Sequence, residues 1–363
     1  MSVRLSSLYT ASALGVGNDA SLASCLGGNA PGMREIEGDI PGRRIWFGFV
    51  PGELPAIAEP RWNMRSNGLI QLALDSEAAF ADLVRRYGAD RVGVVLGASN
   101  TGIDEAERYF DEWLSSCADA PPAGFDFSMI ELGTPSLFLR ERIGAKGPAY
   151  TVSTACSSAA KALGAARRLI ERGICDAVVT GGVDGRCRFA MNGFHALGAL
   201  SEGRCRPLAD DRDGINLGEG VALFAMERAD AADGAGVALA GVGESSDAYH
   251  ATAPDPEGRG AEASMRLALA DAGLEPCEID YVNLHGTGTQ ANDAMEMKAL
   301  RRVFGDELPR YESTKRLTGH CLGAAGAVEA AVCALLIRSG HVRAALSNSF
   351  AFGGSNASVV LVR

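Results

Sequence analysis

A pattern that occurs twice along the chain limits the folds open to it more than any other feature. Each copy runs from a loop into an Ala-rich helix, then to a glycine and into a strand. The first copy follows Cys156 and reaches its strand at 176–182, and the second follows His320 and reaches its strand at 342–348. Alanine favours helices and β-branched residues favour strands, so both copies are predicted to be α/β units. Such units are common, and the repeat alone does not assign a fold.

The first copy begins with a thiol at a change from strand to helix. Residues 149–152 favour a strand, residues 158–164 favour a helix, and small side chains surround Cys156. Unpaired N–H groups at a helix N-terminus favour a thiolate, so we expect a lowered pKa for this thiol. A buried, inert cysteine is the usual fate of a free thiol, and the run alone leaves both interpretations open.

Two distant histidines favour the catalytic interpretation. His285 follows an apolar run that predicts a short buried strand, and it opens a Gly/Thr loop. His320 lies in another loop that leads into a helix of small residues. A thiol with two histidines suits acyl transfer followed by carbanion chemistry, because the thiolate holds an acyl group while imidazole N–H groups stabilise an enolate.

Other kinds of site lack their sequence signatures. The chain has no G-x-S-x-G elbow, no C-x-x-C or H-E-x-x-H spacing, and no dinucleotide fingerprint. His320 and Cys321 are adjacent, so their side chains point in different directions, and no metal is expected. The net charge of −11 argues against a nucleic-acid partner.

Four blocks of sequence resemble the signature blocks of elongating β-ketoacyl-acyl carrier protein (ACP) synthases. The resemblance runs from about Arg91 to the C-terminus, and the blocks occur in the family's order. The Cys-His-His set points to the elongating enzymes, since the initiating class is expected to carry Asn in place of the second His. The blocks are 154–158 (TACSS), 285–289 (HGTGT), 313–320 (STKRLTGH) and 348–356 (NSFAFGGSN).

The resemblance implies a role for each residue near the thiol. Cys156 would take an acyl chain from the phosphopantetheine of ACP as a thioester, with its own N–H and that of Phe352 forming the oxyanion hole. Gly353 and Gly354 belong to the block that forms the acyl gate. The two histidines would bind malonyl-ACP and promote loss of CO2, and the enolate would attack the acyl group. The product is a 3-ketoacyl chain longer by two carbons.

Four further residues take supporting roles by the same resemblance. Lys315 matches the lysine that supports the histidines electrostatically, and Glu329 matches the glutamate of the same network. A buried structural ion pair is the alternative for these two, and both interpretations are compatible. Thr287 and Thr289 would hydrogen-bond the phosphopantetheine arm. No intrinsic cofactor is implied, because the phosphopantetheine arrives on the carrier protein.

The resemblance also implies the overall architecture. It is the thiolase-type fold, an α/β class in which two duplicated halves stack as a five-layer αβαβα core. Residues 1–230 would form the N-terminal half with the nucleophilic Cys, and residues 231–363 the C-terminal half with the two His. The Ala/Asp/Gly-rich stretch 228–237 would be the surface turn between them. The family forms dimers, so a dimer is expected.

Some positions depart from the common pattern. Only seven residues separate Gly340 from Asn348, where typical elongating synthases carry an extra strand and loop. Ala351 stands where the usual block has Gly, which predicts a stiffer gating loop. Together with the runs 97–103 and 215–220, this block resembles the ketosynthases of aryl polyene pathways more than housekeeping fatty acid synthases. The resemblance to those enzymes implies pairing with a chain-length-factor subunit as an alternative, so a homodimer and a heterodimer both stay open.

The composition of the chain limits which partners and which cellular compartment are expected. A chain of 363 residues with 47% hydrophobic content and irregularly spaced cysteines is predicted to be a soluble, reduced, cytoplasmic protein without a membrane span. Its acidic balance complicates docking of ACP, which is itself usually acidic, so a local basic patch is required. The candidates for that patch are Arg61, Arg65, Lys315 and Arg316.

Two other functions were weighed against the condensing enzyme. A non-catalytic chain-length-factor-like subunit would not need the intact cysteine and histidines. A thiolase-type acyl-CoA enzyme would want a second catalytic cysteine, for which Cys321 is the one candidate. We expect His195 to be a packed histidine, His250 to lie in a second gating loop, and Asp293 and Glu296 to stabilise the first turn of a helix.

Overall fold

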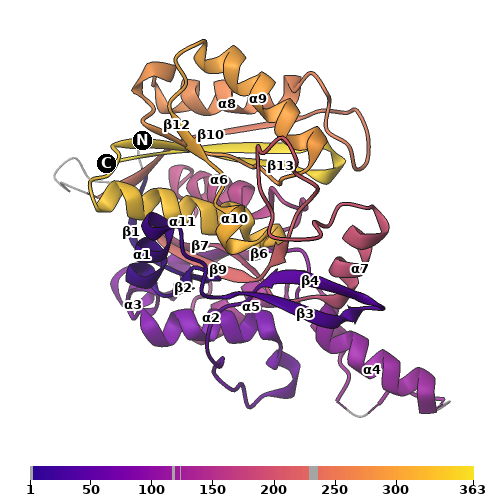
Figure 1. Cartoon of the computed structure of the whole chain (residues 1–363). Helices are drawn as coiled ribbons and strands as arrows, with labels where there is room; N and C mark the ends of the chain where they lie inside the picture. Colours follow the sequence, from indigo (N-terminus) through magenta and orange to yellow (C-terminus); the bar gives the residue numbers. More distant parts are fainter. Residues whose placement is uncertain (1–2, 117–118, 123, 229–235) are drawn as a thin grey trace.

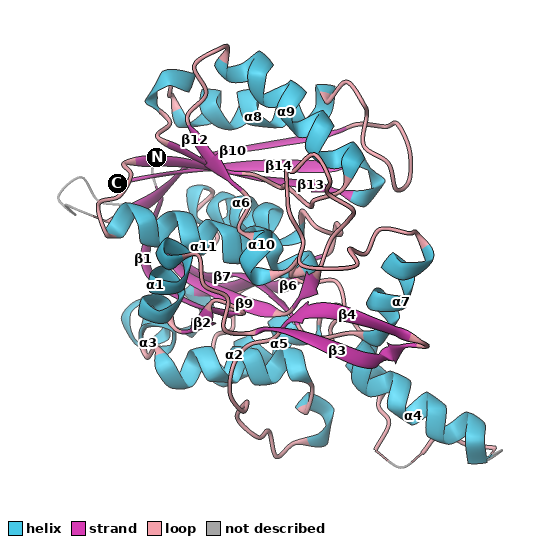
Figure 2. Ribbon diagram, in the orientation of Figure 1, coloured by secondary structure: helices cyan, strands magenta, loops and turns pink. Residues whose placement is uncertain are grey.

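The computed structural model of the chain describes residues 3–116, 119–122, 124–228 and 236–363. Its helices and sheets alternate in five layers, as Figure 1 shows from the lower helices to α8 and α9 at the top. The predicted αβαβα order is therefore confirmed. Figure 2 shows the same layers by type of secondary structure.

The lower sheet follows the strand order β1-β9-β7-β5-β6. α2 (Arg65–Ser76), α3 (Ala79–Tyr87) and α5 (Thr134–Ile143) cover its outer face. Its strands β5 and β7 are buried along their whole length, as expected for a sheet packed on both faces. The strands are β1 (Val3–Ser12), β5 (Val92–Gly97), β6 (Ala149–Val152), β7 (Ala177–Asp184) and β9 (Gly220–Arg228), and β2 (Gly15–Val16) pairs with β1.

The upper sheet follows the order β12-β11-β13-β14-β10. Two helices, α8 (Arg259–Ala272) and α9 (Gln290–Phe304), form the outermost layer, and α8 packs on β10 and β14. The strands are β10 (Val237–Ser246), β11 (Tyr281–Asn283), β12 (Arg310–Glu312), β13 (Ala344–Ala351) and β14 (Ser355–Val362).

The central layer contains the two repeated helices, α6 (Ser158–Glu171) and α11 (Ala325–Arg338). α6 packs on β5 and β7, and α11 packs on β13 and β9. Every residue of α11 from 325 to 337 is buried, which accounts for its Ala-rich, nearly uncharged sequence. Small residues also let the layers approach closely: a Cβ on Gly97 would lie 2.3 Å from the backbone nitrogen of Ala159 in α6. The two repeats thus place their helices side by side between the sheets.

The two sheets share one strand. β1 runs antiparallel to β9, and its first residues, Val3 to Leu5, also pair with β10 of the upper sheet. The predicted boundary at 228–237 falls between β9 and β10, and most of it lies outside the described residues. The boundary at residue 230 itself stays a prediction.

Smaller elements surround this core. A three-stranded sheet of β3, β4 and β8 lies beside α7, and α4 projects at the lower right of Figure 1. These elements are α1 (Asn18–Gly27), β3 (Met33–Ile40), β4 (Arg43–Gly48), α4 (Ile103–Ser116), α7 (Arg188–Ala196), β8 (Leu217–Gly218) and α10 (Lys315–Thr318). Short 3-10 turns are η1 (Pro60–Trp62), η2 (Ala89–Arg91), η3 (Phe127–Ile130), η4 (Pro276–Glu278), η5 (Leu322–Ala324) and η6 (Phe352–Gly354).

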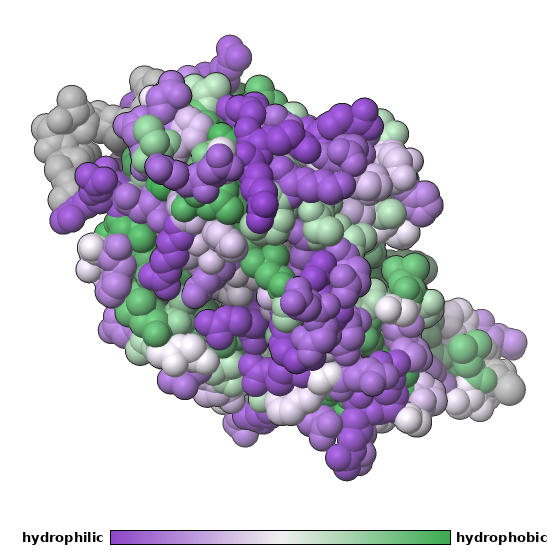
Figure 3. All heavy atoms as spheres, turned by 45° about the horizontal axis from the view of Figure 1, so that its top comes forward, coloured by the Kyte–Doolittle hydropathy of each residue, from purple (hydrophilic) through white to green (hydrophobic). Residues whose placement is uncertain are grey.

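The connection between α11 and β13 is short, as the sequence indicated. Only residues 339–343 separate the helix from the strand, so the extra strand and loop of typical elongating synthases have no counterpart at this point. Hydrophilic side chains cover much of the face shown in Figure 3. Within the described ranges, no helix has both the length and the apolar character needed to cross a bilayer.

Candidate active site

The thiol of Cys156 is presented by a turn between β6 and α6. Ala155, directly before it, has a φ of 52°, a left-handed conformation that is unfavourable for a residue with a Cβ. Hydrogen bonds hold this turn: the Oγ of Ser158 accepts the N–H of Thr154 at 2.9 Å, and its hydroxyl donates to the carbonyl of Ala155. Cys156 is 6% exposed and lines two adjoining cavities.

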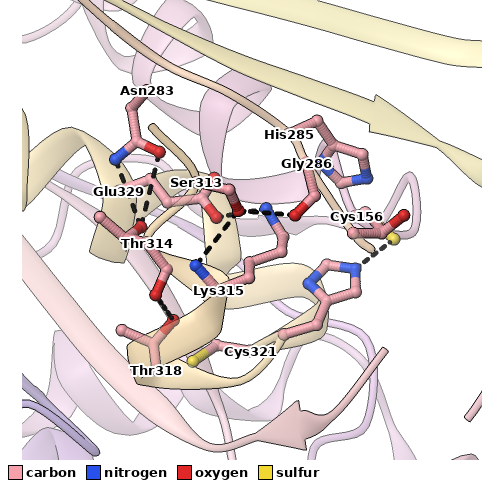
Figure 4. Close-up of polar contacts among 12 residues, drawn as sticks. Cys156, Asn283, His285, Gly286, Ser313, Thr314, Lys315, Thr318, Cys321 and Glu329 are labelled. Atoms are coloured by element: carbon pink, nitrogen blue, oxygen red, sulfur yellow. Dashed lines mark hydrogen bonds and ion pairs between the residues drawn. The ribbon is translucent and has the colours of Figure 1, made fainter. Parts of the chain in front are cut away.

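Both predicted histidines meet this thiol. The Nε2 of His320 lies 2.9 Å from the Sγ of Cys156, and one ligand atom from each of Cys156, His285 and His320 lies within 4.8 Å of the others. The two imidazole rings are 5.4 Å apart and nearly perpendicular. Figure 4 shows the thiol in contact with one ring and facing the other, while the sulfur of Cys321 points away from Cys156.

Burial controls the ionisation of Cys156. It raises the pKa of the thiol to about 11, and this effect outweighs the lowering by Lys315 and by the backbone N–H groups of Phe352 and Cys156. The sequence-based expectation of a lowered pKa is therefore wrong for the structure without substrate. The sulfur is a thiol at neutral pH, and it needs a proton acceptor before it can attack.

The two histidines are unprotonated and are therefore available to accept that proton. Burial and the positive charge of Lys315 hold the pKa of His320 well below its ordinary value, and the pKa of His285 is lowered by the same two causes and by His320. Both imidazoles are thus neutral at physiological pH. The Nδ1 atoms of both rings are buried without a hydrogen-bond partner among the described residues.

Lys315 and Glu329 form a buried ion pair behind the histidines. The Nζ of Lys315 donates to the Oε1 of Glu329, and both side chains are almost completely inaccessible. Burial raises the pKa of Glu329 to about 7, although Lys315 acts in the opposite direction. The structural ion pair of the sequence analysis is therefore present, and its lysine acts on the ionisation of the thiol and of both imidazoles.

Two carboxylates that the sequence analysis placed at a helix start also hold the His285 loop. Glu296 accepts the backbone N–H groups of His285 and Gly286, each at 2.8 Å. Asp293 accepts the N–H of Gly288 at 3.2 Å. The N-terminus of α9 is capped by Thr289, whose side chain accepts from the backbone of Asn292. The structure places Asp293 in the first turn of α9, as predicted, and Glu296 beyond that turn, and both residues also fix the loop that carries the imidazole.

The larger cavity, of about 390 Å³, leads from this triad toward the surface. Thr287 and Thr289 line it, and their hydroxyl oxygens are 2.9 Å apart. Both threonines thus line the same cavity as Cys156.

The Phe352 loop separates this cavity from a second one. Phe352 lines both cavities, and its ring stacks on Phe194 at a centroid distance of 5.6 Å. Gly353 and Gly354 have φ values of 80° and 72°, which favour glycine. Gly353 also donates its N–H to the carbonyl of Ala251 at 2.7 Å, so this loop is tied to the segment that contains His250.

Two expectations about charged residues need correction. Lys315 is completely buried and cannot belong to a docking patch. Arg65 pairs with the buried Glu219, and Arg61 pairs with Glu141, so neither guanidinium is a free charge. Arg316 is only partly exposed.

The two other histidines considered in the sequence analysis lie outside the triad. His195 contacts Arg43 through its Nδ1 at 3.4 Å, in agreement with a packed histidine. His250 accepts the backbone N–H groups of Thr252 and Ala253 with its own Nδ1. The ring of His250 is thus engaged within its own loop.

The donor atoms of Cys156, His285 and His320 are also close enough to hold a metal ion together. Such an ion would occupy the sulfur and both imidazoles. Acyl transfer through a cysteine, assisted by neutral imidazoles and by two N–H groups directed at the sulfur, is the chemistry that this arrangement supports on a thiolase-like fold. The molecule is an acyltransferase of the condensing type.

Comparison with known proteins identifies the family. The description "Beta-ketoacyl synthase, N-terminal domain" matches residues 80–232, and "Beta-ketoacyl synthase, C-terminal domain" matches residues 237–348. The chain belongs to the β-ketoacyl synthase family. It is 35% identical to 3-oxoacyl-[acyl-carrier-protein] synthase 2 of Rhizobium meliloti (strain 1021), over 97% of this chain and 96% of the relative.

Solved structures agree with this assignment. The ketosynthase ApeO of Xenorhabdus doucetiae, in complex with its chain length factor ApeC, superimposes with a TM-score of 0.93 at 39% identity, over 99% of this chain and 98% of the other. The ishigamide ketosynthase/chain length factor gives a TM-score of 0.90 at 28% identity, over 99% and 98% of the two chains. The fold and the family expected from the sequence are thus confirmed.

Proposed function

We propose that this chain is a 3-oxoacyl-ACP synthase that elongates an acyl chain by decarboxylative Claisen condensation with malonyl-ACP. The observation that carries the proposal is the contact of 2.9 Å between the Sγ of Cys156 and the Nε2 of His320, with His285 beside both. The nucleophile, its proton acceptor and a second imidazole share one cavity, and that set serves both acyl transfer and enolate formation.

The first half-reaction loads the acyl group. The thiol of Cys156 gives its proton to the Nε2 of His320 as the sulfur attacks the thioester carbonyl of acyl-ACP. The backbone N–H groups of Cys156 and Phe352, which lower the pKa of the free thiol, hydrogen-bond the resulting oxyanion. The tetrahedral intermediate then expels the phosphopantetheine sulfur, which takes the proton from His320. The acyl chain remains on Cys156.

The second half-reaction makes the carbon–carbon bond. Malonyl-ACP enters with its phosphopantetheine arm along Thr287 and Thr289. The neutral imidazoles of His285 and His320, the latter after proton exchange with water to the tautomer that carries its proton on Nε2, donate N–H bonds to its thioester oxygen. The malonyl carboxylate leaves as CO2, and its bonding electrons form the enolate. The enolate carbon attacks the acyl carbonyl, Cys156 leaves as a thiolate and takes up one proton, and the 3-ketoacyl chain departs on ACP.

The substrate pathway and the assembly belong to the same proposal. The likeness to ApeO, which was solved with a chain length factor, supports a role in aryl polyene chain elongation and a heterodimer of this kind, with a homodimer as the other arrangement. Phosphopantetheine on ACP would supply the only cofactor, and the cytoplasm would be the site of action. Residues 1–230 and 231–363 would be its two halves.

The test is intact-mass spectrometry of the protein, purified with any subunit that accompanies it, after incubation with acyl-ACPs and then malonyl-ACP. The wild type is expected to gain one acyl mass, lose it on addition of malonyl-ACP, and release a chain two carbons longer. Cys156→Ala should gain nothing. Cys321→Ala is the matched control, since its sulfur is equally buried but contacts the carbonyl of Glu219, and it should load like the wild type. Acyl loading on the Cys156→Ala variant would refute the proposal.

A further inference from the structure

The three side chains of the triad also form a set of metal ligands. Each contributes one donor atom, and the donor atoms of Cys156, His285 and His320 all lie within 4.8 Å of one another. The three residues come from separate segments of the chain and line one cavity, and Figure 4 shows how the sulfur of Cys156 and the ring of His285 face one another. Sulfur and imidazole nitrogen are the ligands that zinc prefers, whereas magnesium and calcium bind oxygen. The chemistry of the donor atoms therefore favours zinc.

The spacing of the donor atoms fits a tetrahedral ion. Zinc–sulfur bonds of about 2.3 Å and zinc–nitrogen bonds of about 2.0–2.1 Å place the ligand atoms about 3.3–3.6 Å apart at the tetrahedral angle. The Sγ of Cys156 and the Nε2 of His320 are 2.9 Å apart, so they need to separate by less than about 1 Å. No pair needs to approach by more than about 1.5 Å, since every separation is within 4.8 Å. Such shifts correspond to modest rotations of the side chains.

Both imidazoles have nitrogens available for coordination. His285 and His320 are 2% and 1% exposed. Among the described residues, the contact between His320 and Cys156 is the one hydrogen bond that their ring nitrogens make, and both Nδ1 atoms are buried without a partner. A buried polar atom without a partner is unfavourable, and coordination satisfies one nitrogen of each ring. The cavity that leads to these atoms admits a water molecule as the fourth ligand of the ion.

The charges around the site act in opposite directions. Lys315 lies close enough to lower the pKa of both imidazoles, and its positive charge is also unfavourable for a bound cation. Its ion pair with Glu329 partly offsets that charge. The thiolate of Cys156 is in direct contact with the ion, and because Coulomb energy falls with distance, this attraction outweighs the repulsion by a lysine that is paired elsewhere.

We propose that Cys156, His285 and His320 bind one zinc ion, and that zinc binding and acylation of Cys156 exclude each other. Binding forms one zinc–sulfur bond and two zinc–nitrogen bonds in place of bonds to water. The thiol proton passes to the solvent and the ion stays divalent, so no oxidant or reductant takes part. The zinc-bound chain has neither a free nucleophile nor a free proton acceptor, and zinc is thus a reversible inhibitor. The metal site does not depend on the proposed function, whereas its effect on acyl loading does.

Alkylation by iodoacetamide tests the metal site without any substitution. The protein, purified with any subunit that accompanies it, is stripped of metal by a chelator, freed of the chelator, and incubated with or without zinc chloride. Each cysteine peptide is then followed by mass spectrometry. Zinc should slow the alkylation of Cys156 at least about tenfold, because a sulfur bound to the ion is withheld from the reagent, and magnesium chloride should have no effect. The exposed Cys277 is the internal control and should react equally in all samples.

Native mass spectrometry of the same samples counts the bound ions. The wild type should hold one zinc ion per chain against a competing chelator. His285→Gln should weaken zinc binding by more than about tenfold, since even the loss of a group that only orients a ligand costs this much. His195→Gln, at a histidine outside the triad, should bind zinc like the wild type. If Cys156 is not protected, or if His285→Gln holds zinc as tightly as the wild type, the ion is an adventitious ion only and the inference is wrong.

Acyl loading separates this inference from the proposed function. With acyl-ACP and a chelator present, Cys156 should load; zinc in slight excess over the chelator should suppress loading, and more chelator should restore it. If zinc protects Cys156 from iodoacetamide but no acyl group loads even with the chelator, the proposed function fails and the metal site stands. If loading proceeds at an unchanged rate on the zinc-bound chain, the mutual exclusion is wrong and the proposed function stands.

Discussion

Replacement of Lys315 by Met tests how the buried ion pair acts on the fold. The side chain of Lys315 is completely inaccessible, and Met fills a similar volume without the charge. Glu329 would then be a buried carboxylate without its cation. Breaking a buried pair in this way costs about 3–5 kcal/mol of the free energy of unfolding. Lys298→Met, which removes an exposed pair with Glu257, is the control and should cost less than about 1 kcal/mol.

The cost should also depend on pH. In the wild type, the pKa of Glu329 is raised from 4.5 to about 7, so between these values the folded protein holds a proton that the unfolded chain has lost. Stability therefore falls by about 1.4 kcal/mol per pH unit up to pH 7 and then levels off. Without Lys315, which lowers it, the pKa of Glu329 rises further, so the fall in stability continues beyond pH 7. The cost of Lys315→Met should thus grow by up to about 1 kcal/mol between pH 7 and pH 8, because the wild type still loses a few tenths of a kcal/mol over that interval.

Urea denaturation at pH 6, 7 and 8 measures the free energy of unfolding. It is applied to the wild type, to Lys315→Met, Lys298→Met and Glu329→Gln, and to the double variant Lys315→Met/Glu329→Gln. The double variant should lose less than the sum of Lys315→Met and Glu329→Gln, because no uncompensated charge remains in it. A cost of Lys315→Met that is equal at pH 7 and pH 8, together with additive effects in the double variant, would refute the reasoning.

Two further predictions concern the thiol and the packing of the layers. Because the pKa of Cys156 is raised to about 11, its alkylation by iodoacetamide should speed up about tenfold per unit from pH 7.5 to 9.5, measured on the peptide by mass spectrometry; a plateau below pH 9 would contradict this. Gly97→Ala should lower the free energy of unfolding by about 1–3 kcal/mol or more, since its Cβ would meet the backbone of Ala159. In the control Gly193→Ala in α7, the Cβ would meet nothing within 4 Å, and the protein should become slightly more stable. Equal urea midpoints of the two variants would show that the close approach at Gly97 is relaxed at no cost.

The sequence predicted the chemistry of this site better than its electrostatics. Cys156, His285 and His320 could be found because each stands where a strand or helix pattern breaks into small residues, and such breaks place side chains at the ends of elements. The pKa of Cys156 could not, because it depends on burial by elements from both halves, which no local pattern encodes. The same holds for Lys315, whose charge suggests a surface position although its side chain lies at the centre of the molecule.

The partners of the buried carboxylates that hold the loops are the second feature that the sequence did not predict. Asp293 and Glu296 follow His285 in a helix start, where local rules assign acidic residues to the first turn. Their actual partners are N–H groups of the preceding loop, and the available signal was that both positions fall on the buried face of α9. The sequence around Asp184 did not indicate its role, since this residue simply ends an apolar run that predicts a strand. Its partners come from loops at 99–100 and 323, far away in the sequence.

The position of β1 bears on how the chain folds as it is synthesised. Ser6 in β1 hydrogen-bonds the carbonyl of Ala225 in β9, 219 residues later, and the first residues of β1 also need β10. At roughly 5–20 residues per second, a ribosome takes about 10 to 45 s to supply that partner. During this time an apolar strand has open edges on both sides and is a target for chaperones or for pairing with other chains. The order of synthesis thus leaves this strand unpaired until its partners, more than 200 residues later in the chain, have been made.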